Sequence, residues 1–256
     1  MPLTACILAY NEERNLPDCL ASVAWADEVL VVDSISTDRT VEIAKAAGAR
    51  VVQRPWPGMN AQRSFAIHEA SHEWVLCVDA DERVTPELKA EVAAAVARTD
   101  GPAGYEVPRH TWYLGRWIDH GGWYPDWKLR LFRRDKARMA GVDPHDRIEV
   151  DGPVGRLQGE LQHYTYRSFS QQIQTIDRFS EAASRELAAD GARFRIWKLL
   201  LRPPAKFLEC WVWKLGFLDG LPGFVIAVAS AFNVFSRYVK LWERQRRLGE
   251  GKGDPS

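Results

Sequence analysis

Paired cysteines are absent from this sequence. Its four cysteines are widely scattered along 256 residues, at Cys6, Cys19, Cys77 and Cys210. This spacing argues against a disulfide framework and against a cysteine-based zinc site, and it is typical of a reducing compartment. A basic segment followed by an apolar one is also missing from the N-terminus, so we expect no signal peptide. No internal repeat is visible, and the only low-complexity tract is the short polar tail 249–256, which we expect to be disordered.

Net charge is absent too, because 34 Lys and Arg balance 34 Asp and Glu. The balance conceals a separation along the chain. Residues 193–247 contain eleven basic and three acidic residues, a net charge of +8. The tail 248–256 carries −1, so residues 1–192 carry −7. An acidic first part and a basic second part indicate different binding partners.

A long uninterrupted apolar run is also missing. The longest nearly uncharged stretch, 221–235, contains Pro222, Gly223 and Asn233, and a membrane span needs roughly 20 apolar residues. Residues 194–242 instead interleave tryptophans with Lys and Arg, a composition typical of helices in the lipid headgroup layer. We predict in-plane attachment to the cytoplasmic face of a membrane, with a re-entrant hairpin as the main variant. The alternative is that these aromatics form a helical core or a dimer interface.

Strand and helix patterns alternate through the first hundred residues. Strands are predicted at 3–9, 28–33, 50–54 and 73–79, and helices at 16–23, 40–47, 61–70 and from 86 onward. This order predicts an α/β fold with a parallel sheet and helices on both faces. Further strands are predicted at 105–107, 111–114 and 128–132, followed by an amphipathic helix over 169–187 that packs on the domain core.

The most informative motif is an apolar run, Val75–Val78, that ends in Asp79-Ala80-Asp81-Glu82. Open α/β folds bind ligands beyond the carboxyl ends of their strands. An Asp-x-Asp pair there suits a hard divalent cation shared with substrate phosphates. The alternative is an acidic turn after a core strand.

Two other strand ends carry suggestive side chains. The first predicted strand is followed by Tyr10, Asn11 and Glu12, and the second ends in Asp33 before the polar segment 34–40. Parallel strands bring such ends to one edge, so an aromatic ring, a carboxylate for a ribose and a metal-binding pair would lie together. Taken singly, Tyr10 is explained by packing and the segment 36–40 by a helix cap.

These motifs resemble the family 2 glycosyltransferases, which have the GT-A nucleotide-diphospho-sugar fold. The matching segments are ILAYNEERNL, VVDSISTDRT and VLCVDADE, and the resemblance covers residues 3–167 as a catalytic domain. A narrower similarity, to the lipopolysaccharide core β-1,4-glucosyltransferase branch, is carried by DWKLRLFRRD, DRIEVDGPVGRLQGELQHYTYRS and KLGFLDGLPGF. We therefore expect a catalytic domain over 1–167, a helical amphipathic extension for membrane attachment or dimerisation over 168–248, and a tail over 249–256.

The resemblance implies roles for individual residues. Tyr10, Glu12 and Asp33 would hold uracil and ribose, and Arg63 would lie near the base or phosphates. The family often has two adjacent acids at the second motif, whereas Asp33 is followed here by Ser34.

The resemblance also implies a metal site. Asp79 would face the ribose or the metal, and Asp81 would ligate Mg²⁺ or Mn²⁺ that bridges the diphosphate. His163 would add a metal or phosphate contact, although a lone histidine is also commonly structural. Arg130 would donate two hydrogen bonds to the diphosphate, its alternative being a surface salt bridge.

An inverting transfer also needs a carboxylate that takes the proton of the acceptor hydroxyl. We assign this base to Asp146, with Asp143 and Glu149 as rivals and a solvated loop as the alternative. The predicted reaction moves a hexose, in the first instance glucose from UDP-glucose, to a lipid-anchored saccharide at the inner membrane. Two rival functions remain open: transfer to polyprenyl phosphate, and a non-catalytic membrane-bound sugar-nucleotide sensor. Nucleic acid is not an expected partner, and a homodimer is the alternative in which the C-terminal aromatics form an interface.

Overall fold

The computed structural model describes residues 2–141, 147–166 and 168–249. It divides the chain into two compact units. Unit 1 comprises residues up to 111 together with 125–164, and unit 2 comprises 112–124 together with the residues from 165 onward. The segment 112–124 therefore leaves the first unit and joins the second, which the predicted linear division at residue 167 did not anticipate.

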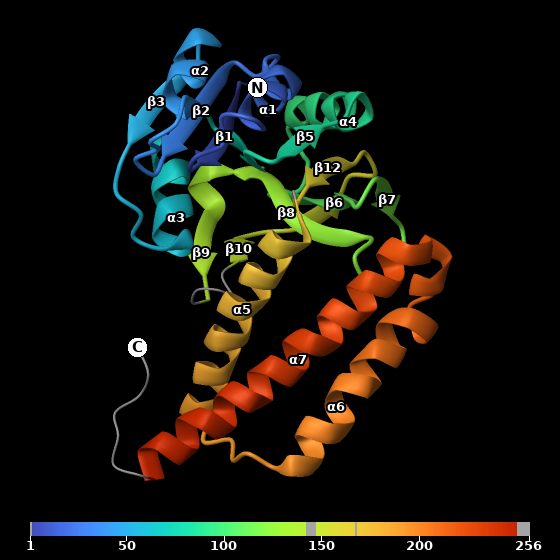
Figure 1. Cartoon of the computed structure of the whole chain (residues 1–256). Helices are drawn as coiled ribbons and strands as arrows, with labels where there is room; N and C mark the ends of the chain where they lie inside the picture. The colour runs from blue at the N-terminus through green and yellow to red at the C-terminus, as the bar shows by residue number, and fades with distance from the viewer. Residues whose placement is uncertain (1, 142–146, 167, 250–256) are drawn as a thin grey trace. The chain divides into compact units, whose positions relative to one another are not determined.

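Unit 1 is built on a mixed β-sheet (Figure 1) whose strand order is β3-β2-β1-β4-β8-β6-β12-β5. The strands of this path are β1 (Leu3–Ala9), β2 (Glu28–Asp33), β3 (Arg50–Gln53), β4 (Trp74–Asp79), β5 (Glu82–Val84), β6 (Gly104–Tyr113), β8 (Asp126–Arg133) and β12 (Leu161–Tyr164). Beside β6 lie β7 (Arg116–Ile118) and β11 (Val154–Arg156), and β9 (Ala137–Ala140) pairs separately with β10 (Arg147–Val150).

Strand direction changes in the middle of the sheet. β3, β2, β1 and β4 are parallel to one another, as predicted. β8 is antiparallel to both β4 and β6, and β12 is antiparallel to β5. The parallel sheet predicted for these four strands is therefore confirmed, and β11 is also parallel to β6. The predicted strands 105–107 and 111–114 are one continuous strand, β6.

Helices cover both faces of the parallel half. The residues of β1 alternate between two hydrophobic cores, with Ala5 and Ile7 in one and Cys6 in the other. The first core is completed by α1 (Leu16–Val23), α2 (Thr40–Ala46) and α4 (Pro86–Ala97). The second is completed by α3 (Met59–Glu69) and by β9 and β10. This packing brings the carboxyl ends of β1, β2 and β4 to one edge of the sheet.

Unit 2 is helical. Its elements are α5 (Phe169–Ala189), α6 (Ile196–Leu208), a π-helical turn (Glu209–Trp213), a 3₁₀ turn (Gly216–Asp219) and α7 (Gly220–Gly249). Helix α7 packs against both α5 and α6. The fully buried carboxylate of Asp219 accepts a hydrogen bond of 2.8 Å from the backbone N–H of His120 and pairs with Arg116 at 3.3 Å. The segment 112–124 is thereby joined to the turn that connects α6 to α7.

Candidate active site

Hydrogen bonds join the loops that follow β1 and β2. The backbone N–H of Asn11 donates to Ser36 Oγ at 2.9 Å, and the N–H of Thr37 donates to Asn11 Oδ1 at 2.8 Å. The N–H of Glu12 donates to Thr40 Oγ1 at 2.8 Å. The polar residues of 34–40 therefore do more than cap a helix, because they also position the backbone after β1.

Asp33 has no exposed surface. Its carboxylate accepts hydrogen bonds from the N–H of Ser36 at 2.9 Å, from the Ser36 hydroxyl, and from Gln53 Nε2 at 3.0 Å. In this structure Asp33 thus holds the loop after β2. Its contact with uracil or ribose stays a prediction, and it requires Ser36 or Gln53 to release the carboxylate.

Two apolar side chains project beside these loops. Tyr10 is 59% exposed and Ile35 is 47% exposed. Ile35 also has a left-handed backbone with φ of 62°, which is a genuine outlier for a β-branched residue. The Glu12 carboxylate accepts from Asn15 Nδ2 at 2.7 Å. An aromatic ring and an aliphatic side chain therefore stand in solvent at the sheet edge where a nucleotide is predicted.

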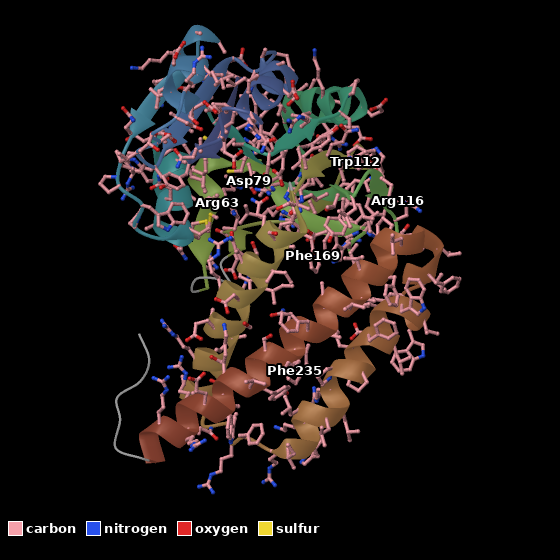
Figure 2. The ribbon with its side chains drawn as sticks, in the orientation of Figure 1. Arg63, Asp79, Trp112, Arg116, Phe169 and Phe235 are labelled. Carbon is pink, nitrogen blue, oxygen red and sulfur yellow. The ribbon has the colours of Figure 1, made fainter. Side chains whose placement is uncertain are left out.

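Asp79, the last residue of β4, lies between two arginines. Its Oδ1 accepts from Arg63 Nη2 of α3 at 2.8 Å, and its Oδ2 accepts from Arg130 Nη2 of β8 at 2.7 Å; Figure 2 labels Arg63 and Asp79. Because each oxygen already has a cationic partner, Asp79 is a poorer metal ligand than the motif predicts. Arg130 is only 4% exposed, which excludes the surface salt bridge and favours a supporting position behind Asp79. Its contact with the diphosphate stays a prediction.

Glu82 extends this cluster into the interior. The side chain is fully buried, and its Oε1 accepts from Arg130 Nη2 at 2.7 Å. Its Oε2 accepts from the backbone N–H of Asp79 at 2.8 Å. Arg109 lies 3.7 Å from Glu82 and donates to Asp126 across the β6–β8 pair. Alternating acids and arginines therefore form a continuous network below the Asp-x-Asp motif.

The pKa values of Asp79 and Glu82 are shifted in opposite directions in this network. Burial by itself would raise the pKa of Asp79, but the guanidinium groups of Arg130 and Arg63 outweigh burial and hold this pKa far below its usual range. Burial raises the pKa of Glu82, and Arg130 only partly opposes that effect. Asp79 is accordingly a permanent anion near neutral pH, positioned by cations on both sides.

Asp81 lies beside the histidine predicted with it. Its Oδ2 is 3.3 Å from His163 Nε2, and the backbone N–H of Tyr164 donates to the Asp81 carbonyl at 2.9 Å. The other ring nitrogen of His163, Nδ1, is 3.3 Å from Thr111 Oγ1, which orients the ring. Residues far apart in sequence thus place one carboxylate oxygen and one imidazole nitrogen together.

This pair suits a divalent cation that is completed by its substrate. Among the described residues no three His, Cys, Asp or Glu side chains form a ready-made metal cage. Mg²⁺ is usually held by one or two protein ligands together with phosphate oxygens and water, and Mn²⁺ accepts both carboxylate and imidazole. Asp81 and His163 are placed to meet that requirement, whereas Asp79, the third predicted ligand, already pairs with two arginines, and the ligand set stays a prediction.

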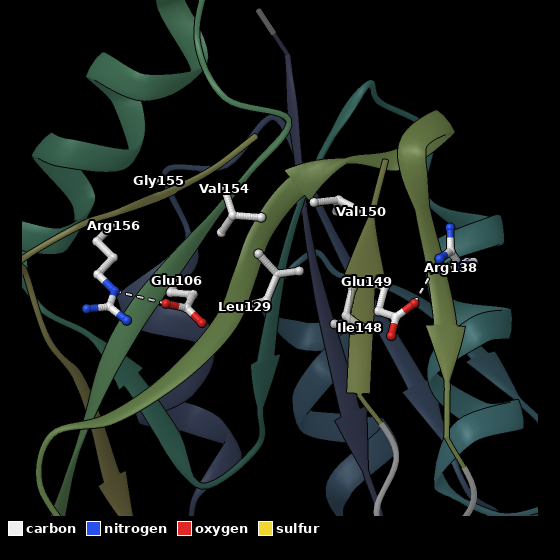
Figure 3. Close-up of a pocket in the computed structure, with 9 residues that line it drawn as sticks. All are labelled: Glu106, Leu129, Arg138, Ile148, Glu149, Val150, Val154, Gly155 and Arg156. Carbon is white, nitrogen blue, oxygen red and sulfur yellow. Dashed lines mark hydrogen bonds and ion pairs between the residues drawn. The ribbon is translucent and has the colours of Figure 1, made fainter. Parts of the chain in front are cut away.

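Glu149, a rival for the catalytic base, lines a different cavity (Figure 3) of about 550 Å³ whose walls include Glu106, Leu129 and Arg156. Asp79, Arg63 and Arg130 are not among the residues that line this cavity. Hydrogen bonds from Arg147 and from Arg138 also lower the pKa of Glu149, which makes it a weak base. The predicted base Asp146 and its other rival, Asp143, lie outside the described residues.

Sequence reasoning missed the buried half of the site. Glu82 was visible as the end of the acidic run, three residues after Asp79, and that spacing was its only signal. Arg109 and Asp126 had no signal, because their pairing depends on the register between β6 and β8. Ile35 is detectable only through its backbone conformation.

Comparison with known proteins identifies the family. The sequence profile of glycosyl transferase family 2 matches residues 4–150. The lipopolysaccharide core biosynthesis glycosyltransferase LpsC of Rhizobium meliloti is 31% identical over 95% of this chain and 93% of its own length. An uncharacterized glycosyltransferase of Rickettsia typhi is also 31% identical, over 94% of this chain and 87% of its own.

Among solved structures, S. aureus TarS 1-349 in complex with UDP-GlcNAc is similar with a TM-score of 0.50 and 16% identity, over 98% of this chain and 93% of that one. This likeness shows the fold. Together with the mixed sheet and the family match, it establishes that the chain is a glycosyltransferase of family 2 with a GT-A fold.

Proposed function

We propose that this glycosyltransferase moves a hexose, in the first instance glucose from UDP-glucose, to a lipid-anchored saccharide such as the lipopolysaccharide inner core. The transfer inverts the anomeric carbon, depends on Mg²⁺ or Mn²⁺, and takes place at the cytoplasmic face of the inner membrane. The observation that carries the proposal is the approach of Asp81 Oδ2 to His163 Nε2, 3.3 Å apart, at the sheet edge where β4 ends.

The side chains around this pair support a nucleotide diphosphate donor. Tyr10 and Ile35 offer exposed apolar surface to a base, in loops whose backbones are already linked by hydrogen bonds. Asp79 and Arg63 present a paired carboxylate and guanidinium close to where a ribose and phosphates would follow. A bound cation would be held by Asp81 and His163 and would supply Lewis-acid stabilisation of the departing diphosphate.

The chemistry is a single displacement at the anomeric carbon. The acceptor hydroxyl oxygen forms a bond to that carbon while the bond from the carbon to the diphosphate oxygen breaks. The hydroxyl proton passes to a carboxylate, for which the sequence motif proposes Asp146. Arg63, together with the cation that Asp81 and His163 would hold, would keep the leaving group in line and limit its reorganisation during the transfer.

The acceptor class is supported by the relative LpsC, whose name places it in lipopolysaccharide core biosynthesis and whose similarity spans nearly the whole of both chains. A lipid-anchored acceptor also gives a purpose to the basic, aromatic second half of the sequence, because enzyme and acceptor would meet on one membrane surface.

The first experiment measures UDP release from a panel of UDP-sugars, with Mg²⁺ or Mn²⁺ and with or without deep-rough lipopolysaccharide. We expect release from one donor only when metal and acceptor are both present. Asp81→Asn should lower kcat/KM by about a hundredfold or more, because it removes a charged metal ligand. The matched control is Asp100→Asn, the same substitution at a side chain that is 84% exposed.

Other outcomes separate the rivals. Release with polyprenyl phosphate instead of lipopolysaccharide, undiminished in Asp146→Asn, would favour the polyprenyl acceptor, since a phosphate needs no base. Saturable UDP-sugar binding without turnover on any acceptor would favour a sensor. Equal activity of Asp81→Asn and Asp100→Asn would contradict the assigned metal site.

A further inference from the structure

Helix α6 leaves its apolar side in solvent. None of its 13 residues is buried. The side chains of Ile196, Trp197, Leu200 and Leu201 are between 48% and 63% exposed. Because residues three and four positions apart lie on the same side of a helix, these four form one continuous surface, here called the α6 stripe. A soluble helix would normally turn such a surface toward its own core.

The opposite side of α6 is basic. Lys198, Arg202 and Lys206 follow one another at intervals of four residues, and residues 193–208 contain five basic residues and no acidic one, although Lys206 pairs with Glu209 at 3.0 Å. A tryptophan-containing apolar side opposite a row of cations is the pattern of a helix that lies in a lipid headgroup layer. The positive charge is complementary to anionic phosphate headgroups.

Helix α7 extends the exposed apolar surface of unit 2. Leu221, Phe224, Val228, Phe232 and Phe235 recur at intervals of three or four residues and are all exposed; Figure 2 labels Phe235 on α7. Since α6 and α7 pack against each other along the hairpin, the α6 stripe belongs to a broader apolar surface of the same unit.

Length and charge argue against a transmembrane arrangement. Helix α6 has 13 residues, includes Pro203 and Pro204, and is shorter than the roughly 20 residues that a span requires. Within the described chain one helix, over Gly216–Arg247, is long and apolar enough to cross a membrane by composition. Its second half, however, is joined to polar side chains of α5: Lys240 pairs with Asp177 at 2.7 Å, and the buried Arg244 pairs with Glu181. Those pairs suit an aqueous setting for that half.

We infer that α6 docks in the plane of an anionic membrane surface, with the α6 stripe inserted among the acyl chains and Lys198 and Arg202 at the phosphates. This inference rests on the proposed function only for its purpose, which is to hold the enzyme where a lipid-anchored acceptor lies. The binding itself requires no turnover, so it can be tested independently of the reaction.

The test is vesicle flotation of the full chain with phosphatidylcholine alone and with phosphatidylcholine mixed with phosphatidylglycerol. We expect preferential binding to the anionic vesicles, weakened by salt. Leu200→Glu with Leu201→Glu should lower the partition coefficient by about tenfold or more, because both side chains would have to be inserted. Lys198→Gln with Arg202→Gln should lower it on anionic vesicles by about fivefold for each charge removed.

The matched control is Gln171→Glu with Gln174→Glu, which adds the same two charges at exposed positions of α5 and should bind vesicles nearly as the parent protein does. Thermal unfolding of each variant checks its folding. Equal vesicle binding by the Leu200/Leu201 variant and the parent would overturn the inference. The inference would also be overturned if light scattering showed that the parent protein is a dimer, that it binds no vesicles, and that the Leu200/Leu201 variant is a monomer. Loss of vesicle binding with normal UDP release would contradict the docking but not the proposed function. Normal vesicle binding without UDP release would contradict the proposed function but not the docking.

Discussion

At the scale of single residues, the backbone of Ile35 is the clearest sign of local strain. A β-branched side chain in the left-handed region brings Cβ close to the following carbonyl, and Ile35 is also half exposed, so burial offsets little of that cost. Strained residues of this kind cluster at functional sites. Here the residue lies in the loop that Asp33 and Ser36 hold in place.

Replacing this residue tests the strain directly. Ile35→Gly should raise the free energy of unfolding by about 1 kcal/mol, because glycine adopts positive φ without a Cβ contact. The measurement is the denaturant concentration at the midpoint of unfolding, compared between variants whose unfolding free energy depends equally steeply on denaturant. Ile35→Ala is the matched control, since it shortens the side chain but keeps Cβ, and it should give little of this gain. A Gly variant no more stable than the Ala variant would contradict the account.

Two of the predicted site residues came from separate local patterns in the sequence. Asp81 and His163 were chosen separately, from an Asp-x-Asp motif and from the segment LQHYTYRS, and the structure brings them together. The position of Arg130 was not predictable, because its burial depends on how β8 packs against β4. The sequence of one strand does not determine which arginines will be buried beside which carboxylates.

At the scale of elements, one carboxylate connects three neighbouring strands. Glu28 begins β2, accepts from Thr4 Oγ1 of β1 at 2.7 Å, and accepts from Arg50 Nε of β3 at 2.8 Å. The N–H and hydroxyl of Ser71, in the loop before β4, also donate to it at 2.8 Å each. The amino ends of the parallel strands are therefore held by the ionised form of one side chain.

This arrangement predicts a specific acid sensitivity. Burial opposes ionisation of Glu28, but hydrogen bonds from Thr4, Ser71 and Arg50 prevail and lower its pKa from 4.5 to about 2. A lowered folded-state pKa contributes stability that is complete above pH 4.5 and is lost as the pH falls toward 2. Glu28→Gln should be destabilised at neutral pH, with a difference from the parent that shrinks across that window.

Thermal unfolding of both proteins from about pH 7 down to about pH 3 measures this difference. Glu42→Gln, at an exposed surface pair with Arg39, is the control and should change stability little. A difference that stays constant with pH would exclude Glu28 as the source of the acid sensitivity.

Element bounds in the first hundred residues follow from local rules, and α1, β1 and β2 have the bounds predicted for them. The face of α5 does not follow from such rules. Its apolar periodicity predicted burial of Phe169 and Phe179, yet these are exposed while Ser180 and Ser184 are buried. Each serine hydroxyl donates to the carbonyl three residues earlier, which satisfies it inside a close helix contact. The periodicity of α5 alone does not state that the helix packs against α7 within unit 2.

At the scale of the whole molecule, opposite charges are separated along the chain, although the formal net charge is zero. A protein whose charges are segregated binds a charged surface through the electric field of its charged region rather than through its net charge. We expect retention on a sulfonate cation exchanger at neutral pH and low salt. Lys198→Gln with Arg202→Gln should elute at lower salt than the parent.

The matched control for retention removes two exposed arginines of unit 1, Arg39 and Arg98. Because these lie in the acidic part of the chain, the control should elute close to the parent. Equal shifts for both double variants would show that retention follows total charge rather than the basic segment.

The four free cysteines have a practical consequence for measuring how this molecule opens. All four are buried, three in unit 1 and Cys210 in unit 2. Burial raises the pKa of Cys6 and Cys19, and it raises that of Cys77 to about 11, so their thiolates are scarce in the folded state. Alkylation of each thiol must therefore wait for local opening. Mass spectrometry of the labelled peptides would time the opening of the catalytic unit and of the helical unit separately, in one unmodified chain.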